Sequence, residues 1–207
     1  NIYAKDNYIV DNFFKANKKI NLNQISKDLL GNFNLQNILA AYIVTKIFKI
    51  KLSIFKKKLK NYQGLPHRFQ VVFENKRIIV INNSKATNVE STYNCLTNLN
   101  NVILILGGRA KEKNFSKINE LHKKISKIYI FGESSNLIRK QLNKNINVTI
   151  FKKLDDIIKN IFNKIKNNKK KLTILLSPAC TSFDHYKSFE ERGNHFINLI
   201  NKYTKAL

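Results

Sequence analysis

The second part of the chain alternates short apolar runs with segments whose apolar residues recur at helical spacing. The runs at 102–106, 127–131, 147–151 and 172–176 are typical of strands inside a parallel sheet. Between the last two runs, the apolar residues of 154–165 fall on one face of a helix. This alternation predicts an α/β fold with a mostly parallel sheet and helices on both faces.

Residues 71–82 show a different pattern, in which two apolar runs flank the polar pair Asn75 and Lys76. A polar step between two such runs predicts a turn, so we expect a strand hairpin here. Further helices are expected at about 87–99, at 115–125, up to Leu142, and in a closing segment from about Phe196 to Tyr203.

The first part of the chain lacks this alternation. Short alternating segments within 1–30 predict antiparallel strands, and an apolar helix is expected to open at Gly31. The stretch 64–68 contains a glycine and one of the two prolines, which indicates a boundary. We therefore expect two parts, 1–63 and 64–207.

The composition indicates a folded protein and does not by itself point to nucleic acid. The hydrophobic fraction is 43%, which is ample for a buried core. The net charge is +25, from 38 basic and 13 acidic residues. The lysines are scattered over nearly every segment, whereas a dedicated nucleic-acid binder clusters Arg and exposed aromatic residues on one element. We expect solvated lysines and nonspecific adhesion rather than a specific nucleic-acid site.

Two further observations bear on where the protein works. Cys95 and Cys180 are too few for a disulfide scaffold or a zinc site, which favours a reducing, cytoplasmic setting. No apolar run approaches the roughly 18 residues of a membrane span. The chain lacks Met and begins at Asn1, so we expect a piece of a longer protein, and a signal peptide is left open.

Three polar loops are expected at the carboxyl edge of the predicted sheet, where open α/β sheets bind their ligands. They cover 81–88, 107–115 and 177–186. Ammonium and hydroxyl groups are the partners that a carboxylate or a phosphate needs. The loops therefore predict an anion site, with the candidates Ser84, Lys85, Thr87, Lys111 and Ser182.

The hydroxyl groups in these loops also have a simpler interpretation as helix caps. Thr87 precedes a predicted helix, and Thr181 has the spacing to Asp184 of a capping box. For any one residue a cap is the preferred interpretation, whereas the three loops together favour the anion site.

Other candidate chemistry has less support. Cys180 lies near His185 in the sequence, but spacing shows neither a contacting base nor an oxyanion hole, so we expect Cys180 to pack behind the loop. The four histidines share no metal-ligand spacing, and no metal site is predicted. The pattern GxxxxGK(S/T) is absent, so the phosphate cradle of an ATP-using protein is expected outside this chain.

Five motifs resemble those of the Mur ligases, and their order and spacing fit across almost the whole chain. The last motif is the most specific, and it resembles the members that add D-glutamate to UDP-N-acetylmuramoyl-L-alanine. The motifs are GNFNLQN (31–37), GLPHRF (64–69), INNSKATN (81–88), LGGRAK (106–111) and LSPACTSFDHYKSFEERG (176–193).

The resemblance implies that 1–63 is the C-terminal part of a central ATP-binding domain, and that 64–207 is a complete, Rossmann-like domain that binds the amino acid. It implies an ADP-forming ligase of peptidoglycan precursor synthesis. ATP would convert the substrate carboxylate to an acyl phosphate, which the amine of D-glutamate attacks. The implied partners are UDP-N-acetylmuramoyl-L-alanine, D-glutamate and ATP, with Mg²⁺ as cofactor, in a cytoplasmic monomer.

The resemblance also implies roles for individual residues. It assigns no catalytic residue and no metal ligand within this chain. The implied ATP contacts are Asn34, Asn37, Arg68 and Asn83. The implied D-glutamate contacts are Lys85, Thr87, Lys111, Ser182, Phe183 and Phe189.

Two positions depart from the family pattern, which has His at Phe33 and Asp at Asn83. An amide accepts a hydrogen bond but carries no charge, so weaker nucleotide binding is expected at Asn83. The phosphate loop, the Mg²⁺ ligands and a carbamylated lysine are expected upstream, so the chain alone is predicted to be inactive. The alternative is a divergent, non-catalytic module that binds a nucleotide sugar or a nucleic acid such as RNA.

Overall fold

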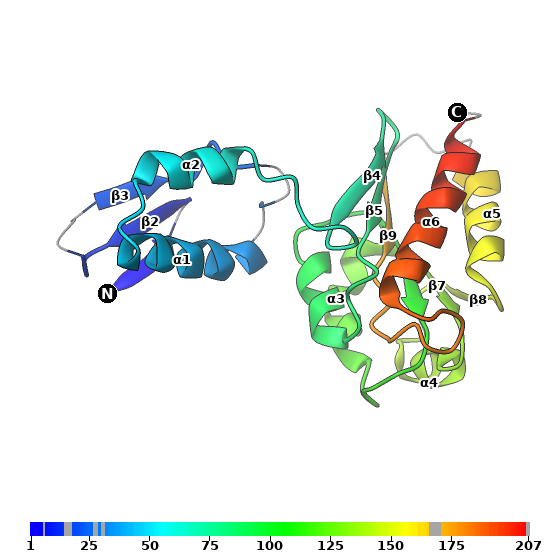
Figure 1. Cartoon of the computed structure of the whole chain (residues 1–207). Coiled ribbons are helices and arrows are strands. Elements are labelled where there is room, and N and C mark those ends of the chain that lie inside the picture. The colour runs from blue at the N-terminus through cyan, green and yellow to red at the C-terminus, as the bar shows by residue number, and fades with distance from the viewer. Residues whose placement is uncertain (6, 15–17, 27–28, 30–31, 166–170, 206–207) are drawn as a thin grey trace. The chain divides into compact units, whose positions relative to one another are not determined.

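The computed structural model contains two compact units, which divide after Gly64 (Figure 1). The first unit is Asn1–Gly64 and the second is Leu65–Leu207. The division expected from the sequence, before residue 64, lies one residue earlier. The structure describes residues 1–5, 7–14, 18–26, 29, 32–165 and 171–205.

The first unit is a three-stranded antiparallel sheet with two helices. Ile9, Ile20, Ile38 and Phe55 form its core together with Tyr42. The strands, in the order β1-β2-β3, and the helices are β1 (Ile2–Lys5), β2 (Tyr8–Asp11), β3 (Lys18–Asn21), α1 (Asn32–Ile47) and α2 (Leu52–Lys60).

The buried hydroxyl of Tyr42 is satisfied by a carboxylate in this core. Tyr42 Oη donates to Asp11 Oδ2 at 2.5 Å. The Asp11 Oδ1 accepts from the backbone N–H groups of Phe13 and Phe14, both at 3.0 Å. Burial, followed by the hydrogen bond to Asp11, raises the pKa of Tyr42, so the phenol stays protonated at neutral pH.

The second unit contains a six-stranded sheet in the order β4-β5-β9-β6-β7-β8. The hairpin of β4 and β5 is antiparallel, and every other neighbouring pair is parallel. This arrangement confirms the predicted α/β fold. The strands are β4 (Gln70–Glu74), β5 (Ile78–Asn82), β6 (Val102–Gly107), β7 (Ile125–Phe131), β8 (Val148–Ile150) and β9 (Leu172–Leu176).

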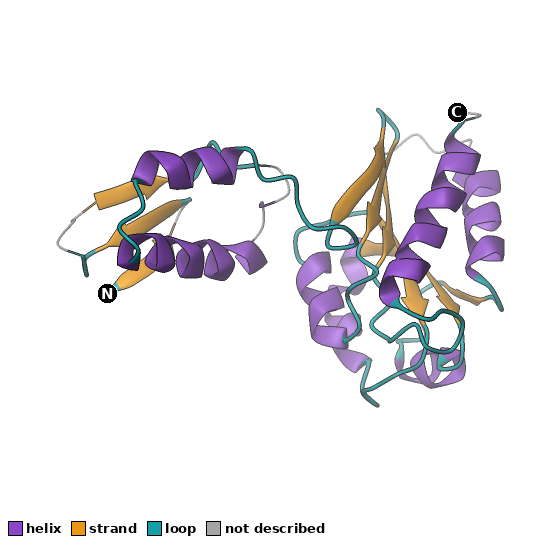
Figure 2. Ribbon diagram, in the orientation of Figure 1, coloured by secondary structure: helices purple, strands orange, loops and turns teal. Residues whose placement is uncertain are grey.

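Alternate residues of the central strands face opposite sides of the sheet, because side chains on a strand alternate with a period of two. Ile103 and Ile105 pack with α5 (Leu154–Lys164) and α6 (Phe189–Thr204) on one face. Leu104 and Leu106 pack with α3 (Val89–Leu96) and α4 (Ser135–Gln141) on the other. Figure 2 shows these helices on the two sides of the sheet. Burial on both faces explains the continuous apolar runs of the central strands.

The segment predicted as a helix at 115–125 differs in detail. It forms the 3-10 helix η2 (Ser116–Lys124), with non-helical dihedral angles at Leu121, and β7 begins at Ile125. Phe115 and Ile118 are nonetheless fully buried, as their spacing predicts. The tighter 3-10 turn is used in short pieces where a connection must change direction.

Candidate functional site

Three loops meet at the carboxyl edge of the second unit's sheet, where the parallel strands β5, β9 and β6 lie side by side. They begin at Asn83, Gly108 and Ser177, directly after these strands. The loops after β6 and β9 are joined by an isolated bridge between Arg109 and Thr181, whose backbone groups exchange hydrogen bonds of 3.0 and 2.9 Å. The predicted convergence of the three loops is therefore present in the structure.

Arg192 of α6 holds the three loops together from behind. Its Nε donates to Ser84 Oγ at 3.0 Å, and its Nη2 donates to the carbonyl oxygens of Ser84 and Cys180 at 2.8 and 3.1 Å. Its Nη1 donates to the carbonyl oxygens of Thr181 and Gly107 at 3.2 and 3.4 Å. One guanidinium thus contacts the ends or loops of β5, β6 and β9.

The sequence interpretation assigned no role to Arg192, although a signal was present. Arg192, Phe196 and Ile200 recur at i, i+4 and i+8 on α6, and all three are 0% exposed. An arginine on the buried stripe of an amphipathic helix requires polar partners, because an unsatisfied buried charge is costly. Burial lowers the pKa of Arg192 to about 10, which leaves the guanidinium charged at neutral pH.

A second buried connection joins the start of the unit to α6 through His67 and Asn82. Asn82 Oδ1 accepts from the backbone N–H of Ser84 at 3.1 Å, so its Nδ2 is the donor toward His67 Nδ1 at 2.9 Å and the Gly193 carbonyl at 3.2 Å. His67 Nδ1 is therefore an acceptor, and the ring is neutral with its proton on Nε2. Burial lowers the pKa of His67, which agrees with the neutral form.

Gly193 makes the close approach to His67 possible. A Cβ atom at Gly193 would overlap the His67 ring at Nδ1. The glycine near the start of α6 therefore has a packing reason, which offsets the lower helix propensity of this residue.

Lys85 and Phe189, both predicted to contact D-glutamate, lie together at the carboxyl edge. The Lys85 ammonium is 3.9 Å from the centroid of the Phe189 ring, a cation–π contact. Ser84 Oγ, which accepts from Arg192, donates in turn to the Phe189 carbonyl at 2.8 Å. The half-buried Lys85 is thus held on a loop that is itself fixed to α6.

The other four predicted substrate residues lie on the same three loops. Thr87 is half-buried on the loop after β5, and Lys111 is exposed on the loop after β6. Ser182 is 2% exposed and Phe183 is 60% exposed on the loop after β9. The backbone places these side chains at one edge of the sheet, while their grouping around a ligand stays a prediction.

The four residues predicted to contact ATP fall in both units. Asn34 is half-buried and Asn37 is exposed on α1 of the first unit, while the side chain of Phe33 lies outside the described part. Arg68 is exposed in the second unit. Its neighbours are anchored, since the His67 carbonyl accepts from Lys85 N and Phe69 N donates to Asn83 Oδ1. An exposed cation on an anchored backbone suits a polyphosphate.

Asn83 uses both ends of its amide to join other segments. Its Oδ1 accepts from Phe69 N, and its Nδ2 donates to Ser177 Oγ, both at 3.1 Å. Ser177 Oγ then donates to Thr92 Oγ1 at 3.0 Å, and Thr92 Oγ1 donates to the Ser177 carbonyl at 3.1 Å. A carboxylate at this position has no proton to donate to Ser177 at neutral pH, so the Ser177 hydroxyl is free to donate to Thr92 only because Asn83 supplies an amide donor.

The helix caps differ from those considered in the sequence interpretation. The N-cap of α3 is Asn88 rather than Thr87, and its side chain accepts from Ser91 N. The N-cap of α6 is Ser188, which accepts from Glu191 N, so no helix begins at Thr181. The Thr181 hydroxyl instead donates to the Arg109 carbonyl at 2.8 Å. The prediction of Thr87 and Thr181 as helix N-caps was therefore wrong. Each helix begins later in the chain than the spacing suggested, with N-caps at Asn88 and Ser188.

Neither cysteine has the environment of a nucleophile. Cys95 and Cys180 are both free and buried. Burial raises the pKa of the Cys180 thiol to about 12 and raises that of Cys95 as well, so both stay protonated. Packing behind the loop, as predicted for Cys180, is confirmed. Among the described residues, there is no cluster of His, Cys, Asp or Glu able to hold a metal and no helix long and apolar enough to cross a membrane.

Taken together, the carboxyl edge has the chemistry of an anion-binding site rather than of a nucleophilic centre. It offers lysines, hydroxyls and aromatic side chains on loops that a buried arginine fixes in place. Such preorganised donors act on a charged ligand without reorganising when it arrives.

Comparison with known proteins identifies relatives of this chain. The family profile described as Mur ligase, glutamate ligase domain, matches residues 67–180. A UDP-N-acetylmuramoylalanine–D-glutamate ligase from Prochlorococcus marinus (strain MIT 9312) is 36% identical over 183 residues, which cover 86% of this chain and 39% of the relative. The ligase of the same name from Buchnera aphidicola subsp. Schizaphis graminum is 39% identical over 201 residues, or 95% and 44% of the two chains.

Solved structures show the same fold at low sequence identity. UDP-N-acetylmuramate-alanine ligase from Thermotoga maritima has a TM-score of 0.63 at 15% identity, covering 86% of this chain and 39% of that one. A MurF ligase from Thermotoga maritima in complex with ADP has a TM-score of 0.61 at 16% identity, covering 100% and 46%. The chain thus spans less than half the length of these relatives.

Proposed function

Because the chain belongs to the Mur ligase family, we propose that it is the D-glutamate-binding portion of an ATP-dependent ligase that adds D-glutamate to UDP-N-acetylmuramoyl-L-alanine. Mur ligases are ATP-dependent amide ligases that use ATP and Mg²⁺. The similarity to D-glutamate ligases over 86% and 95% of the chain supports the choice of amino acid. The proposal includes peptidoglycan precursor synthesis and a cytoplasmic monomer.

The observation that carries this proposal is the set of three loops fixed by Arg192 at the carboxyl edge of the sheet. D-glutamate has two carboxylates, and the loops offer the ammonium groups of Lys85 and Lys111 to pair with them. Hydroxyl groups add donors, and aromatic rings cover the aliphatic part of the ligand. In this proposal the contacts to D-glutamate come from Lys85, Thr87, Lys111, Ser182, Phe183 and Phe189.

These residues would bind and orient the incoming amine rather than act on it covalently. ATP, when bound, supplies the phosphoryl group that activates the substrate carboxylate. Arg68, exposed between two anchored residues, would contact its phosphates, while Asn34, Asn37 and Asn83 are the proposed amide contacts. Holding the amine close to the activated carboxylate lowers the barrier by proximity and orientation.

The full-length protein tests the activity directly. We expect phosphate release only when ATP, UDP-N-acetylmuramoyl-L-alanine and D-glutamate are all present. An equal rate with L-glutamate or L-lysine in place of D-glutamate would contradict the proposed specificity. The 207-residue chain by itself is expected to show no turnover.

A single substitution tests the placement of the site. Lys111→Ala is expected to raise the KM for D-glutamate about tenfold, the loss of one charge-assisted hydrogen bond, with a smaller change in kcat. Lys113→Ala removes an equally exposed lysine two residues away and serves as the matched control. An unchanged KM in Lys111→Ala would remove this residue from the site.

The alternative function is a non-catalytic nucleic-acid-binding module, which would use the net charge of +25. Salt dependence separates the two proposals, since attraction to scattered lysines weakens steeply as salt rises. Sequence-selective RNA binding that survives physiological salt would favour this alternative over the ligase.

A further inference from the structure

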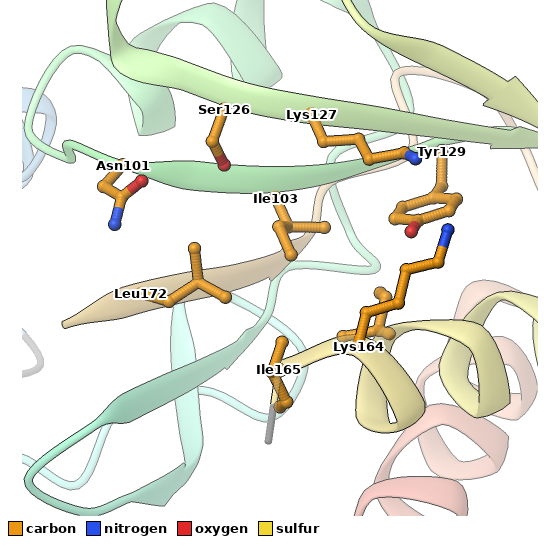
Figure 3. A pocket seen from close by; sticks show the side chains of 9 residues that line it. Asn101, Ile103, Ser126, Lys127, Tyr129, Lys164, Ile165 and Leu172 are labelled. Carbon is orange, nitrogen blue, oxygen red and sulfur yellow. The ribbon is translucent and has the colours of Figure 1, made fainter. Parts of the chain in front are cut away.

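A separate cavity of about 490 Å³ opens at the opposite edge of the same sheet (Figure 3). It lies where β6, β7 and β9 begin, beside the end of α5. Its volume is in the range of small-molecule sites. The proposed D-glutamate site lies at the carboxyl ends of β5, β6 and β9, so the cavity has no part in it.

One part of the cavity is apolar. Ile103, Leu172 and Ile165 are at most 9% exposed, and Ile161 is fully buried. They come from two strands, from α5 and from its C-cap residue Ile165. Aliphatic side chains from a sheet and a helix form a surface on which a hydrocarbon or an aromatic ring gains free energy by leaving water.

The other part of the cavity is cationic. Lys127 of β7 and Lys164 of α5 both extend toward the ring of Tyr129 (Figure 3). The Lys127 ammonium is 4.9 Å from the centroid of that ring. Tyr129 Oη donates to Asn160 Oδ1 at 2.9 Å, which orients the ring.

Nothing among the described residues neutralises this pair of lysines. None of the residues that line the cavity is acidic, and neither lysine forms an ion pair with any described side chain. Burial, and then the positive charge of Lys164, lowers the pKa of Lys127. Two ammonium groups beside apolar side chains repel each other, and an anion between them relieves that repulsion.

We propose that this cavity binds a small amphiphilic anion. Its carboxylate or phosphate monoester lies between Lys127 and Lys164, and its aliphatic or aromatic body packs on Ile103, Ile161 and Leu172. The apolar part distinguishes this site from a bare phosphate site, because inorganic phosphate gains nothing from it. The site is independent of the proposed ligase function.

Octanoate, an aliphatic carboxylate, is a suitable probe for the 207-residue chain. We expect saturable binding by calorimetry, and NMR shifts concentrated on the methyl groups of the apolar lining residues Ile103, Ile161, Ile165 and Leu172. Inorganic phosphate has an anionic group but no hydrocarbon chain, and 1-octanol has the chain but no charge. Both are expected to bind far more weakly than octanoate. Phosphate binding as tight as that of octanoate would overturn the proposal, as would the absence of octanoate binding.

Charge-matched variants test the two lysines. The double variant Lys127→Gln, Lys164→Gln is expected to bind octanoate about tenfold more weakly or worse. Lys153→Gln, Lys159→Gln removes two exposed lysines before and within α5 and is expected to bind like wild type. An equal loss in the two variants would show general attraction to a basic protein and would overturn the proposal.

A single variant distinguishes loss of octanoate binding from loss of folded structure. Lys164 is exposed near the end of α5, so Lys164→Gln leaves the packing of the sheet unchanged. Its circular dichroism spectrum is expected to match wild type while octanoate binding weakens about threefold or more. Unchanged binding in this folded variant would overturn the placement of the anion between the two lysines.

Discussion

Replacing Arg192 with alanine is expected to loosen all three loops of the proposed D-glutamate site at once. The substitution removes donors from Ser84 Oγ and from the carbonyl oxygens of Ser84, Cys180 and Thr181, at 2.8 to 3.2 Å, and from the more distant carbonyl of Gly107 at 3.4 Å. At about 1 kcal/mol net for each of the four shorter bonds, the free energy of unfolding falls by ~4 kcal/mol.

The measurement is urea unfolding of the 207-residue chain, followed by circular dichroism, with the transition of the second unit fitted separately. Arg192→Lys keeps the charge but concentrates its donors on one nitrogen, so it is expected to cost roughly half as much. Arg77→Ala removes an exposed arginine between β4 and β5 and is expected to change stability by less than ~0.5 kcal/mol.

Hydrogen exchange adds a local measurement. The amides of Arg109 and Thr181 bond to each other's carbonyl groups and are expected to lose protection in Arg192→Ala before the central strands do. A destabilisation below ~1 kcal/mol would refute the reasoning, and so would unchanged protection of these two amides.

Three further substitutions have defined outcomes. Burial lowers the pKa of His67, so below about pH 6.5 the unfolded chain takes up a proton that the folded ring does not. The free energy of unfolding is therefore expected to keep its full contribution from His67 above that pH and to fall as the pH is lowered toward 5. If a His67→Gln variant lost stability as steeply as wild type over this pH range in urea unfolding, the result would contradict this. Gly193→Ala is expected to cost about 2 kcal/mol, because the new Cβ overlaps His67, and a cost near zero would refute the close approach. Asn83→Asp is expected to cost ~1 kcal/mol at neutral pH by removing the hydrogen bond that Asn83 Nδ2 donates to Ser177, whereas tighter ADP binding by the full-length Asn83→Asp protein would support the nucleotide contact.

The apolar pattern was sufficient to predict most of the second unit. Runs such as 102–106 and 172–176 became fully buried strands, because a strand covered by helices on both faces needs no polar side. The hairpin around Asn75 also formed as predicted, since the Asn75 side chain accepts from Arg77 N and Ile78 N in the turn. Local patterns of this kind depend on residues close together in the sequence.

Features that depend on residues far apart in the sequence were harder to predict from the apolar pattern. The 3-10 geometry of η2 and the caps at Asn88 and Ser188 depend on where the chain has to turn, which the spacing of hydroxyls left ambiguous. The role of Asn83 depends on Phe69 and Ser177, which lie 14 and 94 residues away. No local pattern records such partners.

For the candidate site, too, some features could be predicted from the sequence and others required the folded structure. Its place at the carboxyl edge, and its lysines and hydroxyls, followed from the order of strands and loops, and the motifs identified the family. The buried network of Arg192 required the folded chain, because its partners at Ser84, Gly107 and Cys180 lie 108, 85 and 12 residues away. A sequence lists possible donors and acceptors, but only the packing of α6 against the sheet decides which of them meet when water is excluded.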